Sequence, residues 1–222
     1  MASLIIVVLL SYLVGSIPNS IIVGKLVKGI DIRDFGSGNA GGTNVSRVLG
    51  WKYGILVILL DALKGALAVI VVARLFAGSV PFENATPFDD FTLVQIMAGV
   101  AAVVGHIWTV FAGFRGGKGI ATALGMLLTI ITVDMLLALG VFMFVLLTSK
   151  YVSLGSIMAA ISVPVILIVR ENVFHVDIPG YHVILPFSIM LTLLIIYTHR
   201  KNVTRILNGN ESQVNLFKKK SK

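Results

Sequence analysis

Apolar side chains fill long, nearly unbroken stretches of the chain, and polar residues gather in the short segments between them. A helix that crosses a bilayer needs about 20 apolar residues, because it rises about 1.5 Å per residue through a hydrocarbon core about 30 Å thick. Five stretches of about this length predict transmembrane helices, at 2–24, 53–75, 91–112, 152–169 and 183–198. The sequence shows no internal repeat, linker or large soluble domain, so we expect a single transmembrane domain over residues 1–222.

The apolar segment 120–149 is long for one helix and carries Asp134 near its middle, where a charge is costly. If the segment crosses once, the basic loops fall on both sides of the membrane; if it crosses twice, turning at Asp134, they fall on one side. Basic loops collect on the cytoplasmic side, which favours two crossings. The pattern therefore predicts an all-α integral membrane protein, a bundle of about seven transmembrane helices with the N-terminus outside and the C-terminus cytoplasmic. The helix at 120–133 rises only about 21 Å, so we expect it to be short or tilted.

Composition supports a membrane setting. Hydrophobic residues make up 57% of the 222 positions and the mean hydropathy is +0.97, against about 45–50% apolar residues in soluble domains. The chain has no cysteine, which excludes disulfides and thiol chemistry. The net charge of +8 comes from basic residues spread over loop ends and the tail FKKKSK at 217–222, which does not indicate nucleic acid binding. The tail fits either attraction to anionic lipid headgroups or a disordered basic terminus.

Three polar segments face the predicted cytoplasmic side, and the first, GSGNAGGTN at 36–44, lies before the second predicted helix. Glycines let backbone N–H groups come close to a ligand, and hydroxyl and amide side chains add donors. The segment is a candidate anion cradle, and a flexible turn at the membrane surface is the alternative. The candidate binding residues are Gly36, Ser37, Gly38, Asn39, Thr43, Asn44 and, with its fork-shaped guanidinium, Arg47.

The second polar segment, GFRGGKGIAT at 113–122, surrounds a lysine with glycines immediately before a predicted helix. Gly116, Gly117 and Lys118 would bring N–H groups and an ammonium to the partly positive N-terminus of that helix, a favourable place for a phosphate. The spacing does not match a nucleotide-binding P-loop, because Ala112 stands where the first glycine belongs and Gly119 where Ser or Thr belongs. A tight structural turn is the alternative.

Charged and titratable residues also occur inside the predicted helices. Asp61 and Lys64 lie three residues apart, so they face the same way and can pair. His106 lies shortly before the second polar segment, where an imidazole would reach a pocket at headgroup depth. Intramembrane charges are functional candidates by default. A self-neutralising ion pair and an interhelical hydrogen bond are the structural alternatives.

The third polar segment, HRKNVTRILNGNES at 199–212, follows the last predicted helix. The motifs GSGNAGGTNVSR, DALKG, GHIWTVFAGFRGGKGIATALG, KYVSL and HRKNVTRILNGNE share the order and spacing of a known family. In these motifs the chain resembles the bacterial acyl-phosphate-dependent glycerol-3-phosphate acyltransferases, called PlsY. The departures leave the polar groups in place: Gly42 stands where the family commonly has alanine, and Thr109 where it has proline.

The resemblance implies transfer of a fatty acyl group from acyl phosphate to the 1-hydroxyl of glycerol 3-phosphate, giving lysophosphatidate and inorganic phosphate. Both substrates carry a phosphate, so two anion cradles at the membrane rim suit the reaction. The resemblance also implies a multi-pass acyltransferase of the bacterial cytoplasmic membrane with its active site facing the cytoplasm. We expect no cofactor, metal ion or nucleic acid, and no covalent acyl-enzyme. The partners expected are the two substrates and membrane lipid, with the protein a monomer.

The resemblance further assigns roles to residues. The first segment would supply substrate-binding donors and residues 116–118 the phosphate loop, while Lys64 matches an intramembrane polar position of the family and is expected to bind substrate phosphate. In the third segment, Arg205 would hold phosphate and Glu211 would orient basic partners, beside Asn202. The residues expected to take part in catalysis are Ser37, Arg47, His106, Lys118 and His199.

The sequence leaves the proton acceptor open between His106, His199 and an oxygen of the acyl phosphate. We expect the last, because no Ser-His-Asp or Cys-His arrangement is present. A transporter or flippase for phosphorylated solutes or lipids is the alternative function. A transporter places polar groups near the midplane and on both rims, whereas the polar clusters here lie on one predicted rim.

Overall fold

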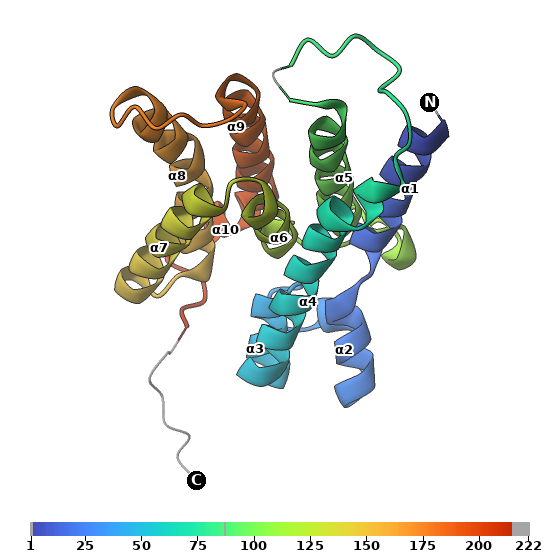
Figure 1. The fold of residues 1–222 in the computed structure, drawn as a ribbon. Helices are drawn as coiled ribbons and strands as arrows, with labels where there is room; N and C mark the ends of the chain where they lie inside the picture. Colours follow the sequence, from blue (N-terminus) through green and yellow to red (C-terminus); the bar gives the residue numbers. More distant parts are fainter. Residues whose placement is uncertain (1, 87, 215–222) are drawn as a thin grey trace. The chain divides into compact units, whose positions relative to one another are not determined.

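A computed structural model describes residues 2–86 and 88–214 of the chain (Figure 1). These residues form ten α-helices and three short 3-10 helices, and none of them lies in a strand. They divide into two compact units, Met1–Thr132 and Val133–Lys222. The basic tail at 217–222, for which the sequence left lipid headgroups and a disordered terminus as alternatives, lies outside the described residues.

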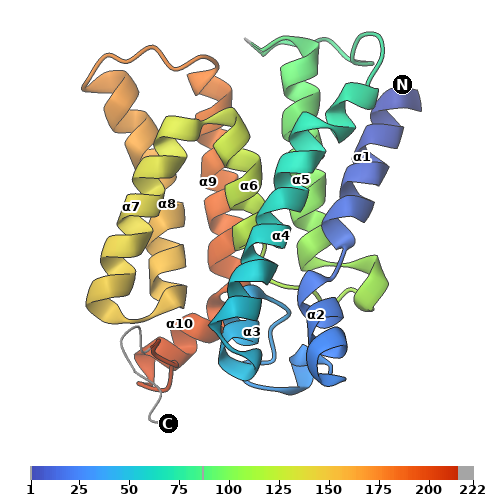
Figure 2. The same ribbon diagram turned by 60° about the horizontal axis from the view of Figure 1, so that its bottom comes forward.

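The first unit is built from six α-helices that pack in pairs. They are α1 Ala2–Ser16, α2 Asn19–Lys28, α3 Gly42–Leu49, α4 Trp51–Ile70, α5 Asp90–Ile107 and α6 Ile120–Ile130. α1 packs along α5, α4 packs along α6, and α3 folds back on α4 (Figure 1, Figure 2). The 3-10 helices η1 Ile32–Asp34, η2 Val72–Leu75 and η3 Val110–Ala112 lie in the connections.

The second unit contains the remaining four α-helices. They are α7 Thr132–Ser149, whose first residue still belongs to the first unit, α8 Val152–Asn172, α9 Tyr181–Thr198 and α10 Arg200–Leu207. α7 and α8 come close where a Cβ on Gly155 would lie 3.1 Å from the ring of Phe142. α8 and α9 are joined by a buried hydrogen bond from Thr192 Oγ1 to the carbonyl of Ala160 at 2.7 Å.

Six spans among the described residues are long and apolar enough to cross a membrane, which confirms the expected all-helical, multi-pass membrane protein. The seventh expected crossing corresponds to α6, an apolar helix of 11 residues. At 1.5 Å per residue α6 rises roughly 16 Å, about half the thickness of the hydrocarbon core. It is therefore the short helix that the sequence suggested, while its crossing and the orientation of the termini stay predictions. The six spans are Ala2–Lys28, Trp51–Leu75, Asp90–Ala112, Thr132–Ser149, Val152–Asn172 and Tyr181–Thr198.

The first span is not the continuous helix that its apolar pattern predicted, because it breaks between α1 and α2. α1 ends at Ser16, and α2 begins at Asn19 with Pro18 as its N-cap. Proline has no N–H and pushes the preceding residue out of the helical region, so Ile17 does not continue α1. The break leaves carbonyl groups at the end of α1 that need hydrogen-bond donors from other elements.

The turn between α6 and α7 falls at Ile131, three residues before the predicted position at Asp134. Asp134 lies in the first turn of α7, is 2% exposed, and accepts a hydrogen bond from Arg170 Nη1 of α8 at 2.7 Å. A carboxylate is favourable in the first turn of a helix, and the arginine compensates its burial. The charge therefore does not need to sit in the turn itself.

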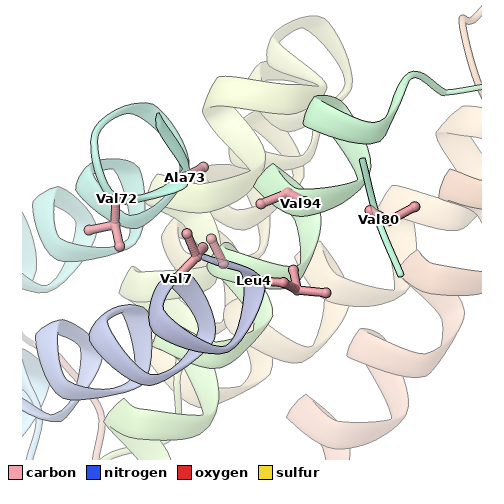
Figure 3. Packing of buried hydrophobic residues seen from close by; sticks show 7 residues of the cluster. Leu4, Val7, Val72, Ala73, Val80 and Val94 are labelled. Carbon is pink, nitrogen blue, oxygen red and sulfur yellow. The ribbon is translucent and has the colours of Figure 1, made fainter. Parts of the chain in front are cut away.

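Two apolar clusters hold the first unit together. One joins α1, η2 and α5 and contains Leu4, Val7, Val72, Ala73, Val80, Val94 and Ala98 (Figure 3). The other anchors the first glycine segment: Ile32 and Ala40 are buried beside Val45 of α3 and Val57 of α4. Burial of one such aliphatic side chain stabilises the fold by about 1.5–3 kcal/mol. Apolar residues on both sides of the glycines thus fix the polar loop to the helices.

α4 and α6 approach each other through glycines. A Cβ on Gly65 would overlap the carbonyl oxygen of Thr122, and a Cβ on Gly125 would overlap that of Ala62. Small residues let membrane helices come into backbone contact, where packing and weak polar contacts hold them. This crossing fixes the first turns of α6, and with them the end of the second glycine loop.

Candidate functional site

The first glycine loop is organised by one buried amide, that of Asn44. Asn44 is 1% exposed. Its Nδ2 donates to the carbonyls of Ile32 at 2.9 Å and Phe35 at 3.0 Å, and its Oδ1 accepts the N–H of Ser37 at 2.8 Å. Gly36 has a φ of +61°, and a Cβ there would overlap Asn44 Oδ1, so this position requires glycine. Both hydrogens of the amide are used inside the protein, and Asn44 therefore shapes the loop.

The other polar side chains of the first loop stay partly accessible. Ser37 and Asn39 are half-buried, as is Thr43 on α3. Arg47 is also half-buried and follows Thr43 by four residues on α3, so the two share a face of that helix. Gly38 is exposed with a φ of +70°. This set contains hydroxyl, amide and guanidinium donors that a ligand at the loop can reach.

Arg33 connects the first loop to the second. Its Nη1 donates to the carbonyl of Ala112 at 2.8 Å, directly before the second polar segment, and to that of Arg115 at 3.2 Å, within it. Its Nη2 lies 2.7 Å from Asp31 Oδ2. The hydrogen bonds from Arg33 lower the pKa of the Asp31 carboxyl, and the same pairing raises the pKa of the Arg33 guanidinium. The pair is therefore ionised at neutral pH and holds the two loops together.

The second glycine loop is tied to the end of α5 by its own backbone. The N–H of Gly116 donates to the carbonyl of Ile107 at 3.1 Å, and the N–H of Gly117 donates to that of His106 at 3.0 Å. These two N–H groups are thus used within the protein, and the two glycines shape the loop. The half-buried Lys118 follows these glycines and lies next to the N-terminus of α6, whose first N–H groups have no partner inside the helix.

The two glycine loops meet at Gly117. A Cβ on Gly117 would overlap His106 Nε2 and lie 2.7 Å from the carbonyl oxygen of Ala40 in the first loop. The absence of a side chain at this position is what allows the imidazole of α5 and the two loops to come together. The sequence predicted two separate anion cradles on one side, and the structure places their backbones in contact.

A buried polar cluster lies inside the helices of the first unit. Asp61 Oδ1 accepts from Asn19 Nδ2 at 3.0 Å and pairs with Lys64 Nζ at 3.0 Å. His106 Nδ1 lies 3.6 Å from the same oxygen. Asp61, Lys64 and His106 are 2%, 4% and 7% exposed. The expected pairing of Asp61 with Lys64 is present, and His106 joins it.

The break between α1 and α2 explains why this ion pair is buried. Lys64 Nζ donates to the carbonyl of Ile17 at 2.8 Å, just past the end of α1, and Thr109 Oγ1 donates to the carbonyl of Ser16. Asp61 binds the side chain of Asn19 at the start of α2. A cation at a helix C-terminus and an anion at a helix N-terminus are both favourable. The pair is therefore placed at the break, where Lys64 adds a donor to a carbonyl past the end of α1 and Asp61 holds the first residue of α2.

The buried cluster and both loops border one small cavity of about 10 Å³. That is room for about one water molecule. The cavity links the charged groups of the cluster to the backbone of both glycine loops. Its lining residues are Ser16, Ile17, Pro18, Asn19, Ser20, Ala40, Asp61, Lys64, His106, Thr109, Gly116 and Gly117.

The third segment forms a closed polar network within the second unit. Glu211 is 6% exposed; its Oε1 accepts from Ser153 Oγ at 2.8 Å and Asn202 Nδ2 at 2.7 Å, and its Oε2 accepts from Arg205 Nε at 2.7 Å. Burial opposes ionisation of Glu211, but the hydrogen bonds from Arg205, Asn202 and Ser153 outweigh it and lower the pKa of the carboxyl. Glu211 thus holds the guanidinium of Arg205 by an ion pair at 2.7 Å.

His199 lies at the junction of α9 and α10 and is 2% exposed. Its Nδ1 lies 2.9 Å from the carbonyl oxygen of Ile195. A carbonyl only accepts, so this contact favours the tautomer with the proton on Nδ1. His199 is held in place by the last turn of α9.

The predicted site residues divide between the units. The first unit brings the two glycine loops together with Lys64 and His106, and the second brings Asn202, Arg205 and Glu211 together. Sequence reasoning missed three residues of these networks: Asn19, Arg33 and Ser153. A polar residue directly after a proline inside an apolar run was the available signal for Asn19, whereas nothing local distinguished the other two.

These features define an integral membrane protein in which two glycine loops touch, the first leading to Arg47 of α3 and the second containing Lys118, both cations suited to phosphate. Comparison with known proteins identifies the family, because a family described as glycerol-3-phosphate acyltransferase matches residues 5–209. The chain belongs to the glycerol-3-phosphate acyltransferase family.

Several members of known sequence or structure are similar to this chain. The glycerol-3-phosphate acyltransferase of Chlorobium phaeobacteroides strain BS1 is 48% identical over 96% of this chain and 97% of its own length. That of Chlorobaculum tepidum is 45% identical over 99% and 100%. The crystal structure of PlsY, an integral membrane glycerol 3-phosphate acyltransferase, in its glycerol 3-phosphate form matches with a TM-score of 0.79 and 38% identity, covering 96% of both chains. Its lysophosphatidic acid form gives a TM-score of 0.76.

Proposed function

We propose that this protein transfers a fatty acyl group from acyl phosphate to the 1-hydroxyl of glycerol 3-phosphate and releases lysophosphatidate and inorganic phosphate. The observation that carries the proposal is the contact between the two glycine loops at Ala40 and Gly117. It puts the loop that leads to Arg47 beside the loop that carries Lys118. A reaction between two phosphorylated substrates needs two neighbouring anion sites. The similar PlsY structures, in glycerol 3-phosphate and lysophosphatidic acid forms, support this substrate and product class.

In this reaction the 1-hydroxyl oxygen attacks the carbonyl carbon of acyl phosphate and forms the ester C–O bond. The C–O bond of the mixed anhydride breaks, and phosphate leaves with the bonding electron pair. The hydroxyl proton ends on a phosphate oxygen. Phosphate is a good leaving group, so the protein contributes orientation and stabilisation of the developing charge rather than a covalent nucleophile.

We assign substrate binding in the first unit to the side chains that remain partly accessible. These are the donors of the first loop and α3 together with the ammonium of the second loop: Ser37, Asn39, Thr43, Arg47 and Lys118. Asn44, Gly116 and Gly117 shape the two loops through the hydrogen bonds described above. Arg47 and Lys118 supply the positive charge that a phosphate in each loop requires.

A phosphate oxygen of the donor substrate is the proton acceptor that fits the structure best. His106 is 7% exposed with Nδ1 facing Asp61, and His199 is 2% exposed with Nδ1 against a helical carbonyl. Both imidazoles are therefore engaged with the protein and shielded from solvent. In the second unit, we propose that Arg205, held by Glu211, adds a further guanidinium for phosphate.

We further propose that the loops face the cytoplasm of a bacterial cell, where the soluble substrate glycerol 3-phosphate would be present. The basic residues of the connecting segments support this orientation by the positive-inside rule. Labelling of single cysteines introduced at Lys118 and Glu83 with a membrane-impermeant thiol reagent tests it. In intact cells the reagent should modify position 83 and spare position 118, and the reverse pattern would contradict the orientation.

The donor is tested with purified protein in detergent, given glycerol 3-phosphate and either palmitoyl phosphate or a palmitoyl thioester. The proposal predicts lysophosphatidate, identified by mass spectrometry, with the acyl phosphate and none with the thioester. Product from the thioester alone would assign a different donor to the same family reaction. Uptake of glycerol 3-phosphate into sealed vesicles without acylated product would support a transporter instead.

A further inference from the structure

The carboxylate of Asp61 takes no part in the proposed chemistry, yet polar groups from three helices converge on it. Asn19 of α2 donates to Oδ1 at 3.0 Å, Lys64 of α4 pairs with it at 3.0 Å, and His106 of α5 lies 3.6 Å away. Asp61 itself is 2% exposed. The Oδ1 that gathers these groups faces the protein interior, so Asp61 acts through its partners.

One of those partners leads directly to the second glycine loop. The imidazole of His106 has Asp61 at Nδ1 and Gly117 at Nε2, where a Cβ would overlap the ring nitrogen. The carbonyl of His106 also accepts the N–H of Gly117, and the next carbonyl, that of Ile107, accepts the N–H of Gly116. Both the ring and the backbone of this part of α5 thus set the position of the glycines that precede Lys118.

We propose that Asp61 is a positioning residue for the phosphate-binding loop, because it orients the His106 ring that supports Gly117. The proposal deepens the proposed function, since it rests on the second glycine loop binding a phosphate. The carboxylate suits this role because it attracts the ring nitrogen that faces it, Nδ1 at 3.6 Å, and favours a proton there. This contact orients the ring with Nε2 against the loop.

The cavity between the cluster and the loops is consistent with this role. Asp61, His106 and Gly117 all line it, and at about 10 Å³ it has no space for a substrate phosphate. In this arrangement Asp61 influences phosphate binding through the loop. A displacement of the loop by 1 Å is enough to reduce a reaction substantially.

The experiment compares Asp61→Asn, His106→Asn and the double variant with Gly117→Ala, which disturbs the contact between the ring and the loop directly. The KM of each phosphorylated substrate and kcat are measured for all variants, and glycerol 3-phosphate binding is measured by calorimetry without donor. Asp61→Asn should raise the KM of the substrate that Gly117→Ala affects by about tenfold or more, with a smaller change in kcat. The double variant should be no worse than His106→Asn alone, because the two residues act in series.

Asp134→Asn is the matched control, because Asp134 is also 2% exposed and also pairs with a cation, but lies in the second unit. It should lower thermal stability and leave both KM values unchanged.

If Asp61→Asn does not fold, the charge-neutral pair Asp61→Asn with Lys64→Met replaces it and is expected to raise the same KM. Three results would overturn the proposal. They are additive effects on KM in the Asp61→Asn, His106→Asn double variant, KM values of Asp61→Asn within twofold of wild type, and no effect of Gly117→Ala on the KM of either substrate. A wild-type protein inactive with acyl phosphate would refute the donor instead, and calorimetry would still decide the role of Asp61.

Discussion

Replacement of Lys64 with methionine tests whether the buried ion pair holds the broken first span together. Methionine fills a similar volume but leaves the Asp61 carboxylate, 2% exposed, without the ammonium that lies 3.0 Å away. Removal of one partner of a buried pair destabilises a protein by about 3–5 kcal/mol. The carbonyl of Ile17 also loses a donor at 2.8 Å. For a chain of this size the expected fall in Tm is roughly 6–20 °C.

The assay is thermal unfolding of the purified protein in one detergent, followed by tryptophan fluorescence. The double variant Asp61→Asn with Lys64→Met should recover about 2 kcal/mol relative to Lys64→Met, since it removes the uncompensated charge, and the carbonyl of Ile17 still accepts the N–H of Asn19. Lys52→Met is the control, because Lys52 is an exposed lysine on the same helix and should change stability by about 0.5 kcal/mol or less. A double variant no more stable than Lys64→Met, or a Lys64→Met protein as stable as Lys52→Met, would refute the reasoning.

Three further predictions concern other contacts. The pKa of Glu211 is lowered in the folded state, so its contribution to stability is complete above about pH 4.5 and is lost as the pH falls through the folded pKa. In Glu211→Gln, the free energy of unfolding measured from unfolding curves should therefore depend less on pH in this acid range. Gly125→Ala should lower Tm by several degrees, because the added Cβ overlaps the carbonyl of Ala62, and an unchanged Tm would contradict the α4–α6 crossing. Arg33→Lys should raise the KM for a phosphorylated substrate with little change in Tm, since one ammonium cannot replace the fork that binds Asp31 and the carbonyls of Ala112 and Arg115. Equal KM values for Arg33→Lys and wild type would contradict that link.

The apolar pattern predicted most of the helices, because lipid imposes length and hydrophobicity on any spanning helix. It missed the break at Pro18, where the surrounding residues are as apolar as in a continuous helix and the compensation comes from Lys64 and Thr109, far along the chain. It also placed the turn of the segment 120–149 at Asp134, whereas the buried contact with Arg170 lets that carboxylate enter α7. Long-range partners decided both positions.

The candidate site shows the same division. Glycines beside Lys118, and hydroxyl and amide groups before Arg47, were visible in the sequence because their chemistry is local. The internal use of the Asn44 amide and of the N–H groups of Gly116 and Gly117 was not visible, since it depends on which carbonyls the fold brings near them. The sequence therefore identified the loops, and the structure distinguishes residues that shape a loop from those that remain accessible to a ligand.

The most direct test of the proposed reaction is release of inorganic phosphate by the purified protein. Wild type and Lys118→Ala are each given acyl phosphate with and without glycerol 3-phosphate, and phosphate is measured over time. Acyl transfer supported by the second glycine loop predicts release that requires both substrates in wild type and collapses in Lys118→Ala. Release by wild type without glycerol 3-phosphate, or equal rates in the two proteins, would contradict it.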